Sequence, residues 1–140
     1  MAKGEIHDLN IDSNEIICRV FDDVVDSIAE NEIFDNPYIP DVPDLEEREH
    51  KYRAAIHQLT GKYYRMNGKR YTLHRIMGYS PENHEEDIYL QVCINNQLRY
   101  IRFFDMWESC GIENEVVNNK LANFYNGAKT LLPRQQDHLR

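Results

Sequence analysis

IYLQVCINNQLRYIRFF, residues 88–104, is the stretch that decides the fold class, because it has the pattern of two antiparallel strands. Apolar residues occupy every second position from Ile88 to Ile94, which is the period of a strand with one buried face. Asn95-Asn96 follows, and asparagine tolerates the positive φ that a tight turn requires. Residues 98–104 then predict the returning strand, after which Asp105 is placed to cap a short helical turn.

The same period of two begins earlier in the chain, at Gly61. Residues 63–66 and 70–79 flank Asn67-Gly68, the dipeptide typical of a β-hairpin turn. A polar loop at residues 80–87 then leads into the strand described above. The span 61–107 therefore predicts four or five short antiparallel strands in a small curled sheet or barrel.

Several segments of this span resemble a family of small bacterial domains of unknown function that have an SH3-like barrel. The matching segments are Gly61-Lys62-Tyr63, Asn67-Gly68, Tyr71-Thr72-Leu73, Glu85-Glu86-Asp87-Ile88-Tyr89 and Tyr100-Ile101-Arg102-Phe103-Phe104-Asp105-Met106-Trp107. The chain departs from the family at Met66, where the family usually has His, and at Phe103, where it has Pro. The resemblance implies a barrel and carries no activity with it.

Two helices are predicted before the strands. Residues 12–31 begin with a capping box and then carry a broad apolar stripe at the spacing of an amphipathic helix. Residues 36–43 contain three prolines, which predict a stiff extended connector. A second capping box opens a helix over residues 44–59 with a weaker stripe.

The C-terminal part predicts one more helix. Its apolar face would be formed by Val117, Leu121, Phe124, Ala128 and Leu131, with Gly127 and Pro133 as stop signals and a frayed end at residues 134–140. The sequence thus predicts an α+β fold with two N-terminal helices, a small antiparallel SH3-like sheet or barrel and a C-terminal helix.

We divide the chain into an acidic helical region at 1–60, a sheet at 61–110 and a helical end at 111–140, packed as one compact unit. The Ile/Val stripe of the first helix must be buried somewhere, and pairing with a second copy would cover it as readily as packing within the chain. A homodimer is therefore one of the expected states.

Composition and cysteine count indicate the cellular location to expect for this protein of 140 residues and net charge −8. No apolar run approaches the roughly 18 residues of a membrane span, and the N-terminus lacks the apolar stretch of a signal peptide. The three cysteines form neither an even set nor a CxxC pair. We therefore expect reduced thiols and a cytoplasmic location, with no cofactor, no metal site and no contact with a membrane.

Charge is unevenly distributed along the chain. Residues 1–50 carry 15 acidic and 3 basic side chains, whereas residues 51–140 carry 9 acidic and 13 basic ones. On the first helix Asp22, Asp26 and Glu30 would stand roughly 6 Å apart along one face, with Asp23 beside them. This pattern predicts binding to a basic protein partner, such as a nucleic-acid-handling protein whose groove normally accepts phosphates.

The size and acidity of the chain are similar to those of small phage proteins that inhibit host defences. The alternative interpretation of the acidic residues is an ordinary solvated helix face.

A basic and aromatic cluster in the predicted sheet supports a second hypothesis, the binding of a nucleotide or a single-stranded nucleic acid. Cations contact phosphates and tyrosine rings stack on bases. The candidate residues are Tyr63, Arg65, Arg70, Tyr71, His74, Arg75, Arg99 and Arg102. The alternative interpretation is that these side chains form the solvated outer face of a curled sheet, with Tyr63 and Tyr71 turned inward. Strand alternation supports part of this alternative, because it predicts that Tyr63 and Arg65 share a face and that Tyr71, Leu73 and Arg75 share a face. The net negative charge makes direct nucleic-acid binding the weaker hypothesis.

No catalytic constellation can be identified. GxSxG, HExxH, Walker and GxGxxG patterns are absent from the sequence. Glu85, Glu86 and Asp87 are consecutive acids that should point in different directions and stay solvated. We therefore predict a non-catalytic binding module.

Overall fold

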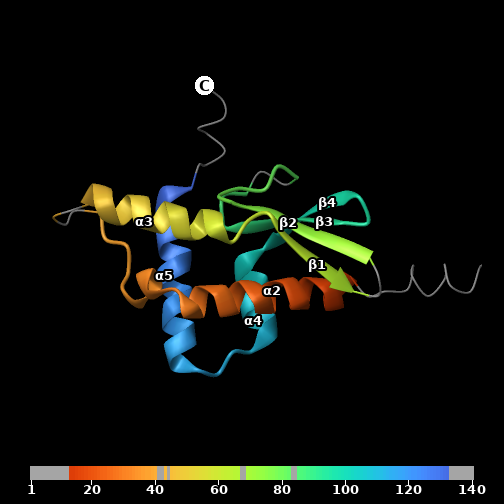
Figure 1. Ribbon diagram of the computed structural model, residues 1–140, viewed down its shortest axis with the longest axis horizontal. Coiled ribbons are helices and arrows are strands. Elements are labelled where there is room, and N and C mark those ends of the chain that lie inside the picture. The colour runs from red at the N-terminus through yellow and green to blue at the C-terminus, as the bar shows by residue number, and fades with distance from the viewer. Residues whose placement is uncertain (1–12, 41–42, 44, 67–68, 83–84, 133–140) are drawn as a thin grey trace, which may run out of the picture.

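The computed structural model describes residues 13–40, 43, 45–66, 69–82 and 85–132, and its α+β fold confirms the predicted class (Figure 1). The described elements are, in chain order, α2 (Ser13–Glu30), the 3-10 helix η1 (Glu32–Asp35), α3 (Leu45–Gln58), β1 (Lys62–Met66), β2 (Lys69–Met77), β3 (Tyr89–Ile94), β4 (Gln97–Arg102), α4 (Phe103–Cys110) and α5 (Glu115–Leu131). In Figure 1, α5 crosses both α2 and α3, and it contacts both of them.

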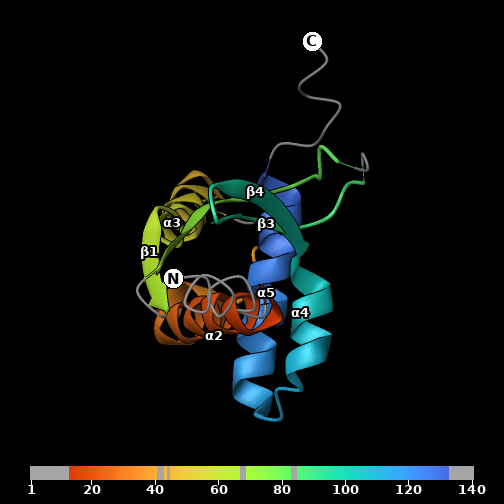
Figure 2. The same cartoon turned by 90° about the vertical axis from the view of Figure 1, so that its right-hand side faces the viewer.

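The four strands pair in chain order as an antiparallel meander, which curls over one end of the helices (Figure 2). The turn between β3 and β4 is formed by Asn95 and Asn96, whose φ angles of 52° and 65° confirm the predicted turn. The predicted turn at Asn67-Gly68 lies outside the described residues.

Strand β3 is buried on both faces, whereas the sequence predicted one buried face. Tyr89 is 3% exposed and Gln91 is 4% exposed, although both alternate with the apolar positions. The reason is that β3 lies between β2 and β4, whose long side chains reach over it. Gln91 Oε1 accepts a hydrogen bond from Arg75 Nε at 3.1 Å, and Gln91 Nε2 donates to the hydroxyl of Tyr100 at 3.0 Å.

The helix after β4 begins earlier than predicted. Helix α4 starts at Phe103, so β4 is shorter than expected and Asp105 lies inside the helix instead of capping it. Arg102 occupies the N-cap position without a side-chain capping bond, because a guanidinium has no acceptor for the helix N–H groups; it donates to Asp87 instead. Gly111 ends the helix in the left-handed region, with φ of 57°.

The apolar stripe of α2 is buried inside the single chain. Ile16, Val20, Val24 and Ile28 are each at most 2% exposed. The ring of Phe21 lies 5.2 Å from the ring of Phe103 in α4, and α2 also packs against α5 and η1. An uncovered stripe was the reason to expect a homodimer, and the chain itself removes that reason.

Gly127 lies in the interior of α5, although the sequence predicted it as a stop signal. A Cβ atom at this position would lie 2.3 Å from Tyr52 Cε2 and 2.7 Å from Tyr52 Cδ2. The ring of Tyr52 is fully buried, and its hydroxyl donates to the carbonyl oxygen of Asn36 at 2.9 Å. Glycine is therefore required here because α3 and α5 approach so closely.

Within the described residues, every helix is too short or too polar to cross a lipid bilayer.

We predict that Gly127→Ala destabilises the protein by about 1–3 kcal/mol, because the added methyl group overpacks a pinned ring. The sign of the change in the free energy of unfolding reports on the contact with Tyr52, since Gly→Ala in a helix interior otherwise stabilises by roughly 1 kcal/mol. Urea denaturation measures the difference, with the exposed neighbour change Asn126→Ala as a control expected within about 0.5 kcal/mol of the parent. A Gly127→Ala variant at least as stable as the parent would show that the contact is loose.

Candidate functional site

The acidic face of α2 is exposed along most of the helix. Asp22, Asp26 and Glu30 follow one another at intervals of four residues, so their carboxylates project from one side roughly 6 Å apart, and Asp23 is exposed beside them. In the part of the chain that the structure describes, no ion pair engages Asp22, Asp26 or Glu30. All four predicted partner-binding residues thus lie on one exposed stretch of helix.

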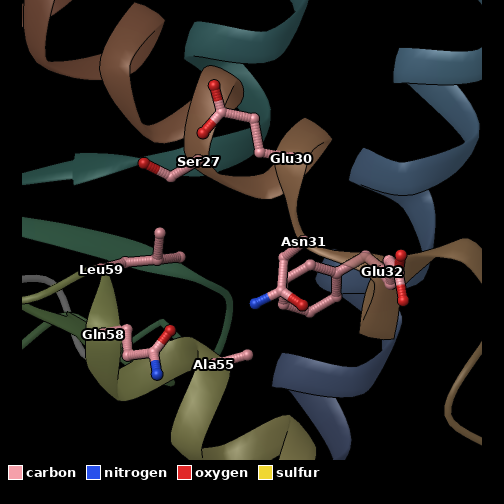
Figure 3. A pocket seen from close by; sticks show the side chains of 8 residues that line it. Ser27, Glu30, Asn31, Glu32, Ala55, Gln58 and Leu59 are labelled. Atoms are coloured by element: carbon pink, nitrogen blue, oxygen red, sulfur yellow. The ribbon is translucent and has the colours of Figure 1, made fainter.

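A hollow of about 460 Å³ lies where this acidic row ends, between the end of α2, η1 and α3 (Figure 3). Its lining includes the apolar side chain of Phe34. Asn31 and Gln58 extend their amides into the space between the helices, whereas the carboxylates of Glu30 and Glu32 stand at the rim. The site therefore combines a floor of buried apolar side chains with neutral hydrogen-bonding groups and a negative edge.

The sheet residues predicted to bind nucleic acid are rearranged by a β-bulge in β2. Leu73 pairs with Val92 and Arg75 pairs with Gln91, so His74 is an extra residue. The bulge shifts the alternation by one position, and as a result Leu73 is buried while His74 and Arg75 are both exposed. The prediction that Leu73 and Arg75 share a face is wrong for this reason.

Other members of the predicted cluster are separated from these two. Tyr71 is 1% exposed, so its ring belongs to the core and offers no stacking face to a base. Arg70 is exposed. Tyr63 and Arg65 belong to β1, but their side chains lie outside the described part of the structure.

The two arginines of β4 lie on opposite faces of the sheet. Arg99 pairs with Val92, whose side chain is in the core, whereas Arg102 pairs with Tyr89 on the outer side. Arg102 is also held by Asp87, with Nε 2.7 Å from Oδ2. Among the members whose side chains the structure describes, the predicted residues therefore do not form one continuous basic surface.

His74 and Arg75 instead line a second hollow, of about 420 Å³, together with Arg53, His57 and Thr60. The last three residues belong to α3 and the turn after it. Neither Arg53 nor His57 is among the residues predicted to bind nucleic acid, although their spacing of four residues places them on one helix face. Their position beside β2 is a tertiary contact that no local pattern encodes.

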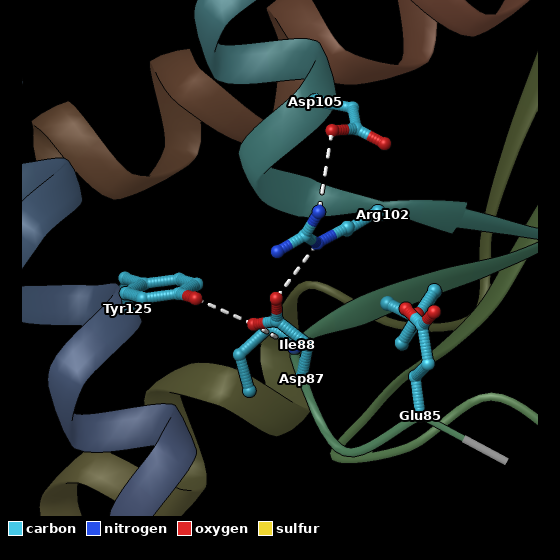
Figure 4. Close-up of polar contacts among 7 residues, drawn as sticks. Glu85, Asp87, Ile88, Arg102, Asp105 and Tyr125 are labelled. Carbon is cyan, nitrogen blue, oxygen red and sulfur yellow. Dashed lines mark hydrogen bonds and ion pairs between the residues drawn. The ribbon is translucent and has the colours of Figure 1, made fainter.

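Asp87 is the centre of a buried polar network that joins the sheet to α5 (Figure 4). Oδ2 accepts from Arg102 Nε, and Oδ1 accepts from the hydroxyl of Tyr125 and from the backbone N–H of Ile88 at 2.8 Å. The side chain is only 8% exposed. The prediction of a solvated carboxylate at this position is wrong, because three donors converge on the group.

The network shifts the pKa values of its members in consistent directions. Burial alone would raise the pKa of Asp87, but hydrogen bonds from Tyr125, Arg102 and Ile88 outweigh it and the pKa is lowered. Burial and the hydrogen bond to Asp87 raise the pKa of Tyr125 to about 12. The hydrogen bond to Asp87 also raises the pKa of Arg102. Asp87 is thus a fixed anion suited to holding structure, and is not poised to exchange protons near neutral pH.

The thiols and metal-ligating groups offer little chemistry in the described residues. Burial raises the pKa of Cys110, and the neighbouring Cys18 and Asp22 act in the same direction, which lowers the fraction of reactive thiolate. Across the described ranges, no three His, Cys, Asp or Glu side chains gather where a metal ion could be held.

Comparisons of the chain with protein-family models, with curated proteins and with solved structures found no match. The resemblance to SH3-like barrel domains therefore stays a prediction.

We predict that Asp87→Asn lowers the free energy of unfolding by about 1–3 kcal/mol at pH 7, because a buried charged acceptor is lost while its donors remain. The pKa of Asp87 lies below the ordinary value of 3.8 in the folded state. Its stabilisation is therefore present above pH 3.8 and is lost as the pH falls through the lower, folded-state pKa.

The difference between parent and Asp87→Asn should accordingly shrink in the acid range when denaturant unfolding is compared at pH 7 and at low pH. Asp105→Asn is the matched control, since Asp105 is 62% exposed and lies 3.7 Å from the same arginine. Its effect should stay within about 0.5 kcal/mol. Equal losses of unfolding free energy in the two variants would contradict the assignment of Asp87 as the centre of the polar network.

Proposed function

We propose that this protein is a non-catalytic binding module whose acidic α2 face docks onto a basic segment of a protein partner. The observation that carries the proposal is the row Asp22, Asp26 and Glu30, which is exposed, engages no ion pair among the described residues and leads into a hollow. A charged row without internal partners retains its field for an external one.

The hollow offers a place where a side chain of the partner could be anchored, which a row of surface charges alone does not. Lysine and arginine have apolar stems and charged heads. A stem could lie in the hollow while the head reaches the Asn31 and Gln58 amides or the carboxylate of Glu30 at the rim. Contacts of this kind give orientation, and the field of the row speeds association.

The partner we propose is a nucleic-acid-handling protein, because its basic groove already accepts a row of negative charges. The module would then act as an inhibitor that competes with the phosphate backbone. A closed SH3-like barrel and a homodimer stay predictions that this function does not require. Nucleic-acid binding by the sheet is the weaker alternative, since Tyr71 lies in the core and Arg99 and Arg102 face opposite sides.

Charge reversal on α2 tests the proposal. Asp22→Lys/Asp26→Lys/Glu30→Lys should weaken binding of a labelled lysine/arginine-rich peptide at least about tenfold, chiefly by slowing association, and should remove its salt dependence. The measurement is fluorescence polarisation at two salt concentrations. The fold should remain nearly intact, because exposed charges contribute individually about 0–1 kcal/mol.

The control must change the net charge equally at another place. Glu82→Lys/Glu108→Lys/Glu113→Lys does so at three exposed positions outside α2 and outside the lining of its hollow, and its peptide affinity should remain within a few-fold of the parent. Equal losses in both triple variants would mean that the peptide senses only net charge, and the proposal would fail. Binding of a labelled single strand by the parent would favour the alternative instead.

A further inference from the structure

The hollow between α3 and β2 has a chemical character opposite to that of the acidic face. Of its lining, Arg53 and His57 come from α3, whereas His74 and Arg75 come from β2. Its described lining contains no carboxylate. In a chain of net charge −8, four cationic or imidazole side chains around one hollow form a local site for an anion.

The β-bulge is the device that puts two adjacent β2 residues into this hollow. Neighbouring residues of a regular strand point to opposite faces, but the extra residue at His74 leaves both His74 and Arg75 exposed. Bulges of this kind occur next to functional sites, where they redirect a side chain.

The orientation of the Arg75 side chain is also fixed by a hydrogen bond to a buried residue of β3. Its Nε donates to Gln91 Oε1 at 3.1 Å, and Gln91, which is 4% exposed, is itself fixed by a 3.0 Å bond from its Nε2 to the Tyr100 hydroxyl. Because Nε is occupied, the two terminal nitrogens of the guanidinium remain the donors for a ligand. Terminal guanidinium nitrogens match the oxygens of a phosphate well.

The remaining walls are apolar. Ile56 of α3, Ile76 of β2 and Leu132 after α5 line the same hollow, whose volume of about 420 Å³ lies in the range of small-molecule sites, roughly 300–1,000 Å³. A simple inorganic anion would fill only a small part of this volume and would not reach the half-buried Leu132. The lining therefore fits an anion that carries an organic body.

We infer that this hollow binds a small phosphomonoester of mononucleotide size, with its phosphate at Arg53 and Arg75 and its flat or apolar part toward Leu132, the half-buried apolar residue of the lining. The inference is independent of the acidic face and of the proposed protein partner. Glu49 limits the affinity of the site for its ligand, since its carboxylate lies 3.5 Å from Arg53 Nε and competes with the ligand for that guanidinium.

Isothermal titration at low salt with four probes tests the inference: adenosine monophosphate, adenosine, glucose 6-phosphate and inorganic phosphate. Adenosine monophosphate should bind more tightly than the other three, because it alone combines the phosphate with a flat apolar body. If glucose 6-phosphate binds equally well, the organic part makes no contact and the apolar half of the inference is wrong. If none of the four binds, the whole inference is wrong.

Variants assign the binding to the hollow. Arg53→Gln/Arg75→Gln should weaken the binding of adenosine monophosphate at least about tenfold. Arg53→Gln alone leaves the hydrogen bond between Arg75 and Gln91 in place and should weaken this binding several-fold. Glu49→Gln should tighten the binding of adenosine monophosphate, because it removes the carboxylate that competes for Arg53. Arg99→Gln, an exposed change of the same type on β4 outside the hollow, should leave the affinity within about twofold. A loss at Arg99 as large as that of the double variant would overturn the assignment.

Discussion

Burial of the α2 stripe against α4, α5 and η1 is the constraint on which the rest of the structure depends. Each fully buried valine or isoleucine contributes roughly 1.5–3 kcal/mol, and the stripe supplies Ile16, Val20, Val24 and Ile28 to the core. Once this face turns inward, the helical period leaves Asp22, Asp26 and Glu30 no position except the surface. The same burial that holds the helix therefore creates the acidic face on which the proposed function rests.

The outer side of the sheet is organised by polar contacts rather than by apolar burial. Asp87 holds Arg102 of β4 and Tyr125 of α5, while Gln91 holds Arg75 of β2 and Tyr100 of β4. A buried carboxylate is tolerated only where its lone pairs are satisfied. Such contacts fix the orientation of side chains, and the position of Arg75 beside the hollow is one result of this.

Local pattern predicts part of this structure and misses the part that depends on distant contacts. The spacing of apolar residues in α2 and α5, and the two asparagines at positions 95 and 96, determine local structure, and those elements lie where the sequence places them. The bulge at His74, the glycine that admits Tyr52 and the burial of Asp87 all arise between segments far apart in the chain. Likewise, the acidic row could be predicted from helical spacing, whereas the hollow beside it requires α3 to be placed against η1.

The central claim is that a basic partner segment is recognised by the acidic face of α2 and the adjoining hollow. Backbone amide chemical-shift mapping of the labelled protein with a lysine/arginine-rich peptide tests this most directly, because it locates the contact without any substitution. The account predicts shifts over residues 22–32 and 55–59, the two sides of the acidic row and its hollow, with β2 unaffected. Shifts confined to the sheet, or spread evenly over all exposed acidic residues, would contradict it.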